Sequence, residues 1–378
     1  MPAVRETALV FLRLGAIAFG GPAAHVAMME AEVVGRRRWL PRDQFLDYLG
    51  ITNLIPGPNS TELAMILGLH RHGRIGMLVA GGCFIAPAAL IVTSIAWAYV
   101  RYGRLPQVAG MLYGVTPVVI AIVLRALVQL AHSAVKSVTL ALLLVAAIVA
   151  IRLGAHELAV LFAAGVVHGL LTTRGRAASV GAIAALAVAP GPVGAASIVA
   201  AESAAVSLWT LGGVFLKIGA VLFGSGYVLL AFLRADFVDR LGWLTERQLI
   251  DAVTVGQITP GPLFTTATFI GYILAGSAGA IVATIAIFLP GFVFVGLSGP
   301  LVPRIRRSRF AGAALDGVNV ASLALMTVVT WQLGRGALVS PLPIVAFLGS
   351  LVLLLRTRLN ATWLLAACAL VGWMVSVR

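Results

Sequence analysis

Charged side chains are scarce in this chain: only 11% of its 378 residues are Asp, Glu, Lys or Arg. Hydrophobic residues make up 60% even before the 41 glycines are counted, whereas soluble domains are about 45–50% apolar with glycine included. No soluble fold of this size can bury so much apolar surface. The composition therefore excludes most soluble enzymes and secreted disulfide scaffolds, and it indicates a polytopic membrane protein.

Acidic residues and cysteines are fewer still. The chain has 13 acids against 27 Lys and Arg, a net charge of +14. Many of the basic residues stand in short loops between apolar segments, where they set topology and contact anionic headgroups, so no nucleic-acid partner is expected. Cys83 and Cys368 lie in apolar stretches and predict neither a disulfide framework nor a metal site. The sequence also lacks a Ser/His/Asp set, a phosphate loop and any flavin or haem signature, so we expect neither a cofactor nor an enzyme.

Long apolar runs, in contrast, are abundant. A helix needs about 20 residues, and no fewer than about 17, to span a bilayer. Ten segments reach this length, near 7–29, 75–100, 108–131, 136–152, 155–172, 207–232, 278–300, 312–334, 338–355 and 360–377. Two further regions, 44–70 and 248–275, are broken in the middle by Pro-Gly-Pro. Proline ends a helix, so each is predicted to form two half-helices that meet at a break.

An internal repeat relates the two halves of the chain. A shift of 204 residues aligns Phe11–Pro58 with Phe215–Pro262 without a gap, and 17 of the 48 positions are identical. The motif Pro56-Gly57-Pro58 then falls on Pro260-Gly261-Pro262. After a one-residue gap the correspondence continues, so we predict a duplicated architecture.

The predicted fold class is an all-α polytopic membrane protein with two inverted repeats. Each repeat is expected to have about five spanning helices and one re-entrant Pro-Gly-Pro helix pair, and an odd number of crossings inverts the second repeat. Loop charge agrees with the positive-inside rule, with 15 Lys and Arg on the cytoplasmic side against 9 on the other. The repeats are placed at 1–176 and 205–378, with a linker over 177–204. A full crossing by its interrupted segment, 177–200, would reverse the parity.

Paired broken helices in inverted repeats are typical of secondary transporters, whose substrate binds near the midplane where the breaks meet. A helix that begins after Pro58 or Pro262 points unpaired N–H groups and a positive dipole end into the protein, and such ends bind anions. The candidate substrate-binding residues at the breaks are Gly20, Gly21, Pro56, Gly57, Pro58, Asn59, Ser60, Thr61, Gly224, Pro260, Gly261, Pro262, Thr265 and Thr266. Simple helix capping by Ser and Thr is the competing interpretation.

Two basic residues at matched positions complete the predicted site. Arg13 and Lys217 both stand well inside apolar segments, where a cation costs about 2.5–3.5 kcal/mol. We therefore predict that they face one shared cavity and bind a divalent tetrahedral oxyanion. Snorkelling of both side chains to the membrane interface is the alternative.

Proton coupling is predicted at His25 and Glu62. Neither has a titratable counterpart in the second half, where Leu229 and Thr266 stand at the matching positions. A proton-coupled carrier needs such a group to face both sides in turn. Arg125, in the middle of an apolar segment, is considered as a partner for Glu62. A buried structural role is the alternative for His25 and Glu62.

Two sets of motifs, one in each half, form a pattern found in a known family. They are Phe19-Gly20-Gly21-Pro22-Ala23-Ala24-His25, Trp39-Leu40, Asn53-Leu54-Ile55-Pro56-Gly57-Pro58-Asn59-Ser60-Thr61-Glu62, Phe223-Gly224-Ser225-Gly226-Tyr227 and Gln257-Ile258-Thr259-Pro260-Gly261-Pro262. This pattern resembles the chromate ion transporter family, and the resemblance covers nearly the whole chain. It implies a two-domain carrier in the bacterial inner membrane that exports chromate, with sulfate as the related oxyanion, and confers chromate resistance.

Several alternatives remain open at this stage. The chain is alternatively an anion channel, a carrier of sulfate or another oxyanion, or a membrane-bound enzyme that processes an oxyanion. Saturation and counterflow distinguish a carrier from a channel, and product analysis detects an enzyme. The expected partners are chromate or sulfate and the lipid bilayer, and a homodimer is also considered.

Overall fold

The computed structural model describes residues 2–19, 21–103, 106–174, 206–223, 228–357 and 361–376, and these ranges contain helices but no strand. The first half comprises α1 (Pro2–Ile17), α2 (Pro22–Glu30), the π-helical turn η1 (Ala31–Arg36), α3 (Arg42–Thr52), α4 (Asn59–Tyr102), α5 (Pro106–Ala134), α6 (Val138–Arg152) and α7 (Glu157–Arg174). The second half comprises α9 (Leu208–Val221), α10 (Leu229–Leu233), η4 (Arg234–Arg240), α11 (Glu246–Ile258), η5 (Leu263–Thr265), α12 (Thr266–Arg307), α13 (Arg309–Ala337), α14 (Pro341–Arg356) and α15 (Ala361–Ser376). The interrupted segment 177–200 lies outside the described residues.

The helix breaks recur at matched places in the two halves. α4 is interrupted at Gly73 with φ of 61°, and α12 is interrupted at Gly276 with φ of 62°. Glycine adopts this conformation at no steric cost. The chain reverses at the first break. The helices on its two sides are in close contact, since a Cβ on Gly68 would lie 2.2 Å from the carbonyl oxygen of Gly76. Each Pro-Gly-Pro motif is therefore followed by a short helix that folds back before a long one begins.

Segment 7–29, expected to be one spanning helix, is instead two helices that fold back on each other. The chain breaks between α1 and α2, and Glu6 near the start of α1 forms ion pairs with Arg37 and Arg71, which lie beyond α2. A single crossing would place Glu6 about 30 Å from Arg37. The expectation of a spanning helix is corrected here, and segment 207–232 is broken in the same way between α9 and α10.

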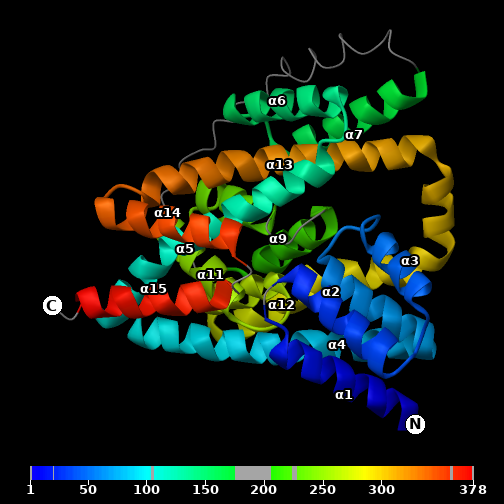
Figure 1. Cartoon of the computed structure of the whole chain (residues 1–378), viewed down its shortest axis with the longest axis horizontal. Helices are drawn as coiled ribbons and strands as arrows, with labels where there is room; N and C mark the ends of the chain where they lie inside the picture. Colours follow the sequence, from blue (N-terminus) through cyan, green and yellow to red (C-terminus); the bar gives the residue numbers. More distant parts are fainter. Residues whose placement is uncertain are drawn as a thin grey trace.

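The two halves are interlocked. α5 packs against α14 and α15 of the second half, and α13 packs against α6 and α7 of the first. Figure 1 shows α13 crossing the molecule beneath α6 and α7, with α1 alongside α4 near the N-terminus. α4 and α12 also pack against each other, so the long helices of both halves share one core.

α5 and its repeat equivalent α13 run antiparallel. Lys136, just after α5, forms an ion pair of 2.9 Å with Asp316 near the start of α13. Tyr113, near the start of α5, forms a hydrogen bond of 2.9 Å with Ser340 just after α13. This opposed direction is the arrangement that inverted repeats require.

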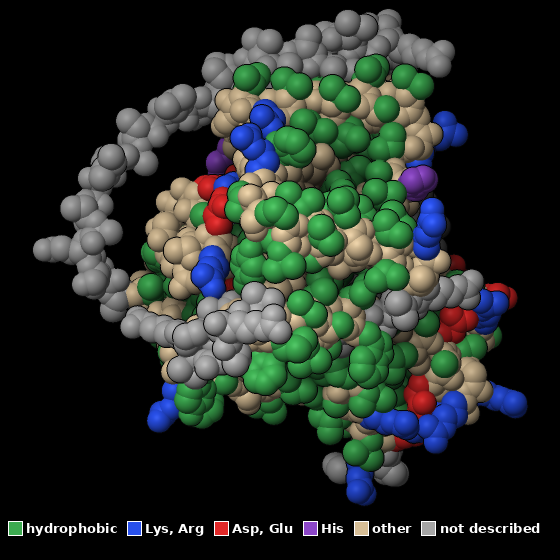
Figure 2. Space-filling model, turned by 60° about the vertical axis from the view of Figure 1, so that its left-hand side comes forward, with side chains coloured by type: hydrophobic (Ala, Val, Ile, Leu, Met, Phe, Trp, Pro, Cys, Tyr) green, Lys and Arg blue, Asp and Glu red, His purple; other side chains and the backbone are tan. Residues whose placement is uncertain are grey.

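The outer surface is apolar over a wide area. Figure 2 shows hydrophobic side chains across most of one face, with Lys and Arg gathered mainly toward its edges. Within the described ranges, four helical stretches are long and apolar enough to cross a membrane: Asn59–Tyr102, Gly110–Ala134, Leu263–Ser298 and Arg309–Ala337. The molecule is thus an all-helical protein with the surface of a membrane protein.

Candidate functional site

Each Pro-Gly-Pro motif is held by a hydrogen bond to the opposite half of the chain. The Gly57 amide donates a hydrogen bond of 2.8 Å to the carbonyl of Leu222, where α9 has just ended. Its repeat equivalent, Gly261, donates one of 3.0 Å to the carbonyl of Ala18, just after α1. A carbonyl freed by a helix break thus satisfies an amide freed by a proline turn.

Glycine is required in both turns. Gly57 has φ of 136° and Gly261 has φ of 89°, conformations that side-chain-bearing residues rarely adopt. Space is limiting as well, because a Cβ on Gly261 would lie 2.6 Å from the Cβ of Ala88 and 3.1 Å from the carbonyl oxygen of Gly15. Each turn thus contacts the half of the chain to which it does not belong.

The two helices that begin at these motifs differ in their polar groups. Asn59 donates a hydrogen bond of 2.7 Å to Asn53, and the buried hydroxyl of Thr61 has no partner among the described residues. In the second half, Thr265 and Thr266 donate hydrogen bonds back to Pro262 and Leu263 of their own loop. The first helix start therefore retains polar capacity for a ligand, whereas the hydroxyls of the second cap their own helix.

Glu62 is fully buried one turn into α4, and neither of its carboxylate oxygens has a hydrogen-bond partner among the described residues. The ion pair between Glu62 and Arg125 that the sequence suggested is therefore not formed. A buried carboxylate without a cation or donor is very costly as an anion, so this environment favours the neutral acid.

His25 is buried and, unlike Glu62, fully hydrogen-bonded. Its Nε2–H donates to the Ala18 carbonyl at 3.0 Å, which leaves Nδ1 to accept from the Ser60 hydroxyl at 3.2 Å. Because the Ala18 carbonyl also accepts from Gly261, the imidazole joins the start of α4 to the Pro-Gly-Pro turn of the other half. This geometry suits a positioning residue.

A cavity of about 690 Å³ with a mixed polar and apolar lining, the wide vestibule, reaches this site from one end of the molecule. It is lined by Pro22, Asn53, Leu54, Asn59, Leu130, Ser133, Ala134, Lys136, Phe223, Val228, Gly312, Leu315, Asp316, Asn319, Ser322 and Leu323. The buried hydroxyl of Ser322 and Oδ1 of Asn59 have no partner among the described residues. The cavity therefore presents free polar groups next to a helix N-terminus.

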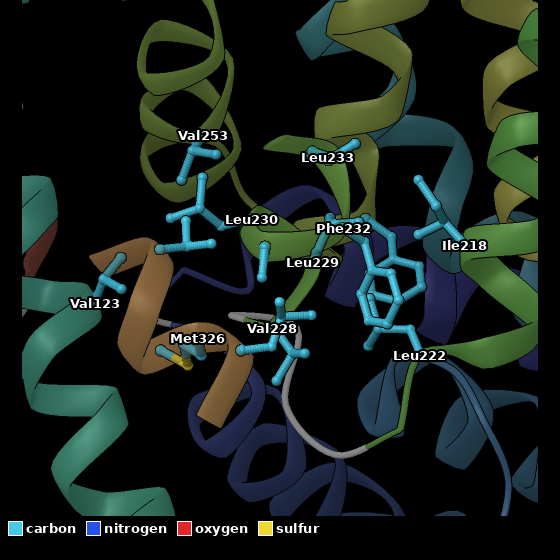
Figure 3. Packing of buried hydrophobic residues seen from close by; sticks show 14 of the residues in the cluster. Val123, Ile218, Leu222, Val228, Leu229, Leu230, Phe232, Leu233, Val253 and Met326 are labelled. Carbon is cyan, nitrogen blue, oxygen red and sulfur yellow. The ribbon is translucent and has the colours of Figure 1, made fainter. Parts of the chain in front are cut away.

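Beyond the vestibule the path is closed by apolar side chains. Val123 of α5, Leu230 of α10 and Val253 of α11 border two spaces of only about 10 Å³ each, which is barely room for one water molecule. Figure 3 shows these three side chains near one another, with Met326 of α13 below them. We call Val123, Leu230 and Val253 the apolar plug.

The structure does not bring Arg13 and Lys217 to this cavity. Arg13 is exposed on the face of α1 opposite its buried residues, and Lys217 forms an ion pair of 2.6 Å with Asp236. Neither lines the wide vestibule. The prediction of a shared cavity is corrected here, because Arg13 lies outside the packed face of α1 and Lys217 is held by Asp236. Gly20 and Gly224 lie outside the described residues.

Sequence reasoning missed the polar groups that α13 and the residues just after α5 contribute. Lys136 and Asp316 pair at the vestibule, and Asn319 lies one helical turn beyond Asp316. An acid and an amide three residues apart on an otherwise apolar helix share one face, and that spacing was the available signal.

Comparison with known proteins identifies the family. The family model described as chromate transporter matches residues 5–170 and 209–373, one match in each half. The chromate transport protein of Cupriavidus metallidurans is 32% identical over 372 residues, which cover 98% of this chain and 92% of that protein. The chromate transport protein of Pseudomonas aeruginosa is 29% identical (97% of this chain, 91% of that protein), and the probable chromate transport protein of Synechococcus elongatus is 30% identical (89% and 86%). No solved structure gives a significant match. The chain therefore belongs to the chromate transporter family.

Proposed function

We propose that this protein is a secondary active carrier that exports chromate, or a sulfate-like divalent oxyanion, across the bacterial inner membrane and so confers chromate resistance. The observation that carries the proposal is the wide vestibule, which ends at the first turn of α4. There Asn59 and Ser60 present the unpaired N–H groups and the positive dipole end of a helix, a setting that binds anions. Family membership and the names of the relatives supply the substrate class.

A carrier accounts for the path better than a channel does. The wide vestibule is open at one end, and the apolar plug closes the other side of the site. Lys136 at the vestibule belongs to the face that the positive-inside rule assigns to the cytoplasm. The vestibule thus faces the compartment from which an exporter collects its substrate.

Glu62 supplies a means of proton coupling. A carboxylate one turn inside the helix start would repel a divalent anion, and protonation removes that repulsion. We expect the oxyanion to bind the form in which Glu62 carries its proton, so that proton and anion are carried together. Export of a divalent anion with one proton moves one net negative charge outward, and an inside-negative potential favours this by about 2.3 kcal/mol per 100 mV.

The proposal is tested by chromate flux in proteoliposomes. We expect saturable flux that competes with sulfate, because the two anions share charge and tetrahedral shape, and that responds to an imposed membrane potential. Nitrate, a planar monovalent anion, serves as the control competitor. Absence of chromate flux from a folded preparation would refute the substrate assignment.

A matched pair of variants locates the site. Asn59→Leu gives the first helix start the residue that the second has at Leu263, and it removes an amide from the vestibule. We expect chromate binding to weaken about tenfold or more, the loss expected for one hydrogen bond to a charged ligand. Leu263→Asn should leave binding nearly unchanged. Equal effects of the two variants would place the anion elsewhere.

A further inference from the structure

The wide vestibule has a smaller counterpart at the opposite end of the molecule. This narrow vestibule, about 230 Å³, is lined by residues of α5, α11 and α13 together with Val339. A shift of 203 residues superposes α5 on α13, and it relates the linings of the two cavities: Leu130 to Leu333, Asp316 to Tyr113, and Asn319 to Thr116. The two vestibules are therefore the same place in the two repeats.

The difference between the vestibules lies in one helix of each repeat. In the second half, α11 packs against α5 and brings Ile250 and Asp251 to the narrow vestibule. In the first half, the equivalent α3 packs against α4 and contributes no residue to the wide vestibule. Two equivalent side chains reflect this difference, because Ile250 is 9% exposed, whereas Leu46 is 47% exposed. We therefore describe α11 as docked against α5, and α3 as not docked against α13, the equivalent of α5.

A cluster of polar side chains holds α11 in its docked position. Arg234 of η4 is only 13% exposed and donates hydrogen bonds to Gln332 of α13 at 2.7 Å and to Glu246 of α11 at 2.6 Å. One guanidinium thus joins three elements next to the narrow vestibule. We call Arg234, Glu246 and Gln332 the closed latch.

The first half contains the same three positions with the charges exchanged. Glu30, Arg42 and Gln129 are the repeat equivalents of Arg234, Glu246 and Gln332, and they form the open latch. Glu30 and Arg42 are paired at 2.8 Å, but Gln129 is exposed and is not hydrogen-bonded to Glu30.

Glutamine suits both versions of the latch. Its side chain carries a carbonyl that accepts from a guanidinium and an NH₂ group that donates to a carboxylate. Gln332 uses the carbonyl with Arg234, and Gln129 has the NH₂ available for Glu30. The charge exchange between the repeats therefore leaves the geometry of the closed latch attainable in the first half.

We propose that the two latches alternate, so that in the second state Glu30 and Arg42 dock with Gln129 while Arg234 releases Gln332. The wide vestibule then closes, the narrow one opens, and the site between them changes sides. This rests on the proposed carrier function and names the contacts that hold each state.

Two repeat-matched reporter cysteines test the exchange. In a chain whose native Cys83 and Cys368 are replaced by alanine, Asn319→Cys reports on the wide vestibule and Thr116→Cys on the narrow one. With intact latches, a hydrophilic maleimide should label the wide reporter faster than the narrow one. Gln332→Ala should raise labelling of the narrow reporter and lower that of the wide reporter, by about tenfold in their ratio for one charge-assisted hydrogen bond.

Gln129→Ala is the matched control, since it removes the equivalent glutamine from the open latch. It should leave the wide reporter reactive and keep the narrow reporter protected. If both glutamine variants shift the two reporters in the same direction, or if neither shifts them, the alternation is wrong.

Cross-linking tests the second state directly. A short bifunctional thiol reagent should join Ile250→Cys to Leu333→Cys at once, because both residues line the narrow vestibule while α11 is docked, and neither belongs to a latch. It should join their repeat equivalents, Leu46→Cys and Leu130→Cys, slowly, and faster when Gln332→Ala is added. Failure of the second pair to cross-link in any background would overturn the proposal.

These readouts need no substrate, so the two proposals fail separately. Reciprocal labelling without chromate flux would support the latches and refute the assigned anion. Chromate flux with no reciprocal labelling would support the carrier and refute the latches.

Discussion

The side chain of Glu62 occupies the space in which Gly57 would otherwise carry a Cβ. Its Oε1 lies 2.1 Å from that position, so the turn and the buried acid fit together only because residue 57 is glycine. The same amide of Gly57 bonds to the other half. The acid, the helix start and the contact between the halves are therefore one mechanical unit.

Gly57→Ala should disable the protein without unfolding it completely. The change displaces Glu62 and forces an unfavourable φ, for a cost of about 1–3 kcal/mol. We expect a lower melting temperature in detergent and loss of chromate flux. Gly82→Ala is the control, since no atom lies within 4 Å of its added Cβ. Equal flux in the two variants would contradict the role given to this turn.

Glu62→Gln should flatten the pH dependence of transport. Glutamine mimics the protonated acid at every pH, so anion binding should persist while the coupling to protons is lost. Flux measured at several pH values, with and without a pH gradient, checks this. Asp43→Asn, at an exposed acid of α3, is the control. A pH profile like that of the unmodified protein would remove Glu62 from the coupling step.

Lys217→Ala should reduce stability more than substrate affinity. It removes one of two cations from the buried Asp236, which retains Arg240 at 2.8 Å, and the loss of such a charged hydrogen bond costs about 1.5–3 kcal/mol. Arg13→Ala, on an exposed face, should change stability by less than about 0.5 kcal/mol. If both variants fold but no longer bind chromate, Arg13 and Lys217 belong to the anion-binding site after all.

Low pH should destabilise the region from α1 to η1, in which Glu32 pairs with Arg37. Glu32 lies outside the four long apolar helices, and the hydrogen bond from Arg37 holds the pKa of its carboxyl below the ordinary value of 4.5. Because the folded value is lower, the pair stabilises the fold fully above about pH 4.5, and this contribution disappears as the pH falls through the folded pKa. Melting temperatures measured from pH 6 down to about pH 3 should show this decline, and Arg37→Gln should weaken it. An unchanged decline would assign the acid sensitivity to other groups.

Local signals in the sequence predicted the helices and the central turns well. Proline and glycine act through their own backbone geometry, so the breaks at the two Pro-Gly-Pro motifs could be located without knowing their neighbours. The repeat then indicated that the two turns are equivalent. The hydrogen bond that each turn makes to the opposite half became visible only in the tertiary structure.

Tertiary contacts decided what the sequence could not. Segment 7–29 has enough apolar length to cross a bilayer, but Glu6 reaches Arg37 only if the segment folds back. Arg13 and Lys217 looked equivalent and buried, yet helix orientation turned one outward and paired the other with Asp236. Hydropathy measures length and composition, and it does not report which neighbour a helix face meets.

The exchange of partners between the halves also constrains how the chain is made. Two of the main partners of α5, the helices α14 and α15, are synthesised more than 200 residues later than α5. Until then, a ribosome-bound first half keeps an unfilled apolar groove that lipid or an insertase must cover. The last two helices thus complete the folding of both halves, and truncation near residue 340 should send the whole chain to degradation.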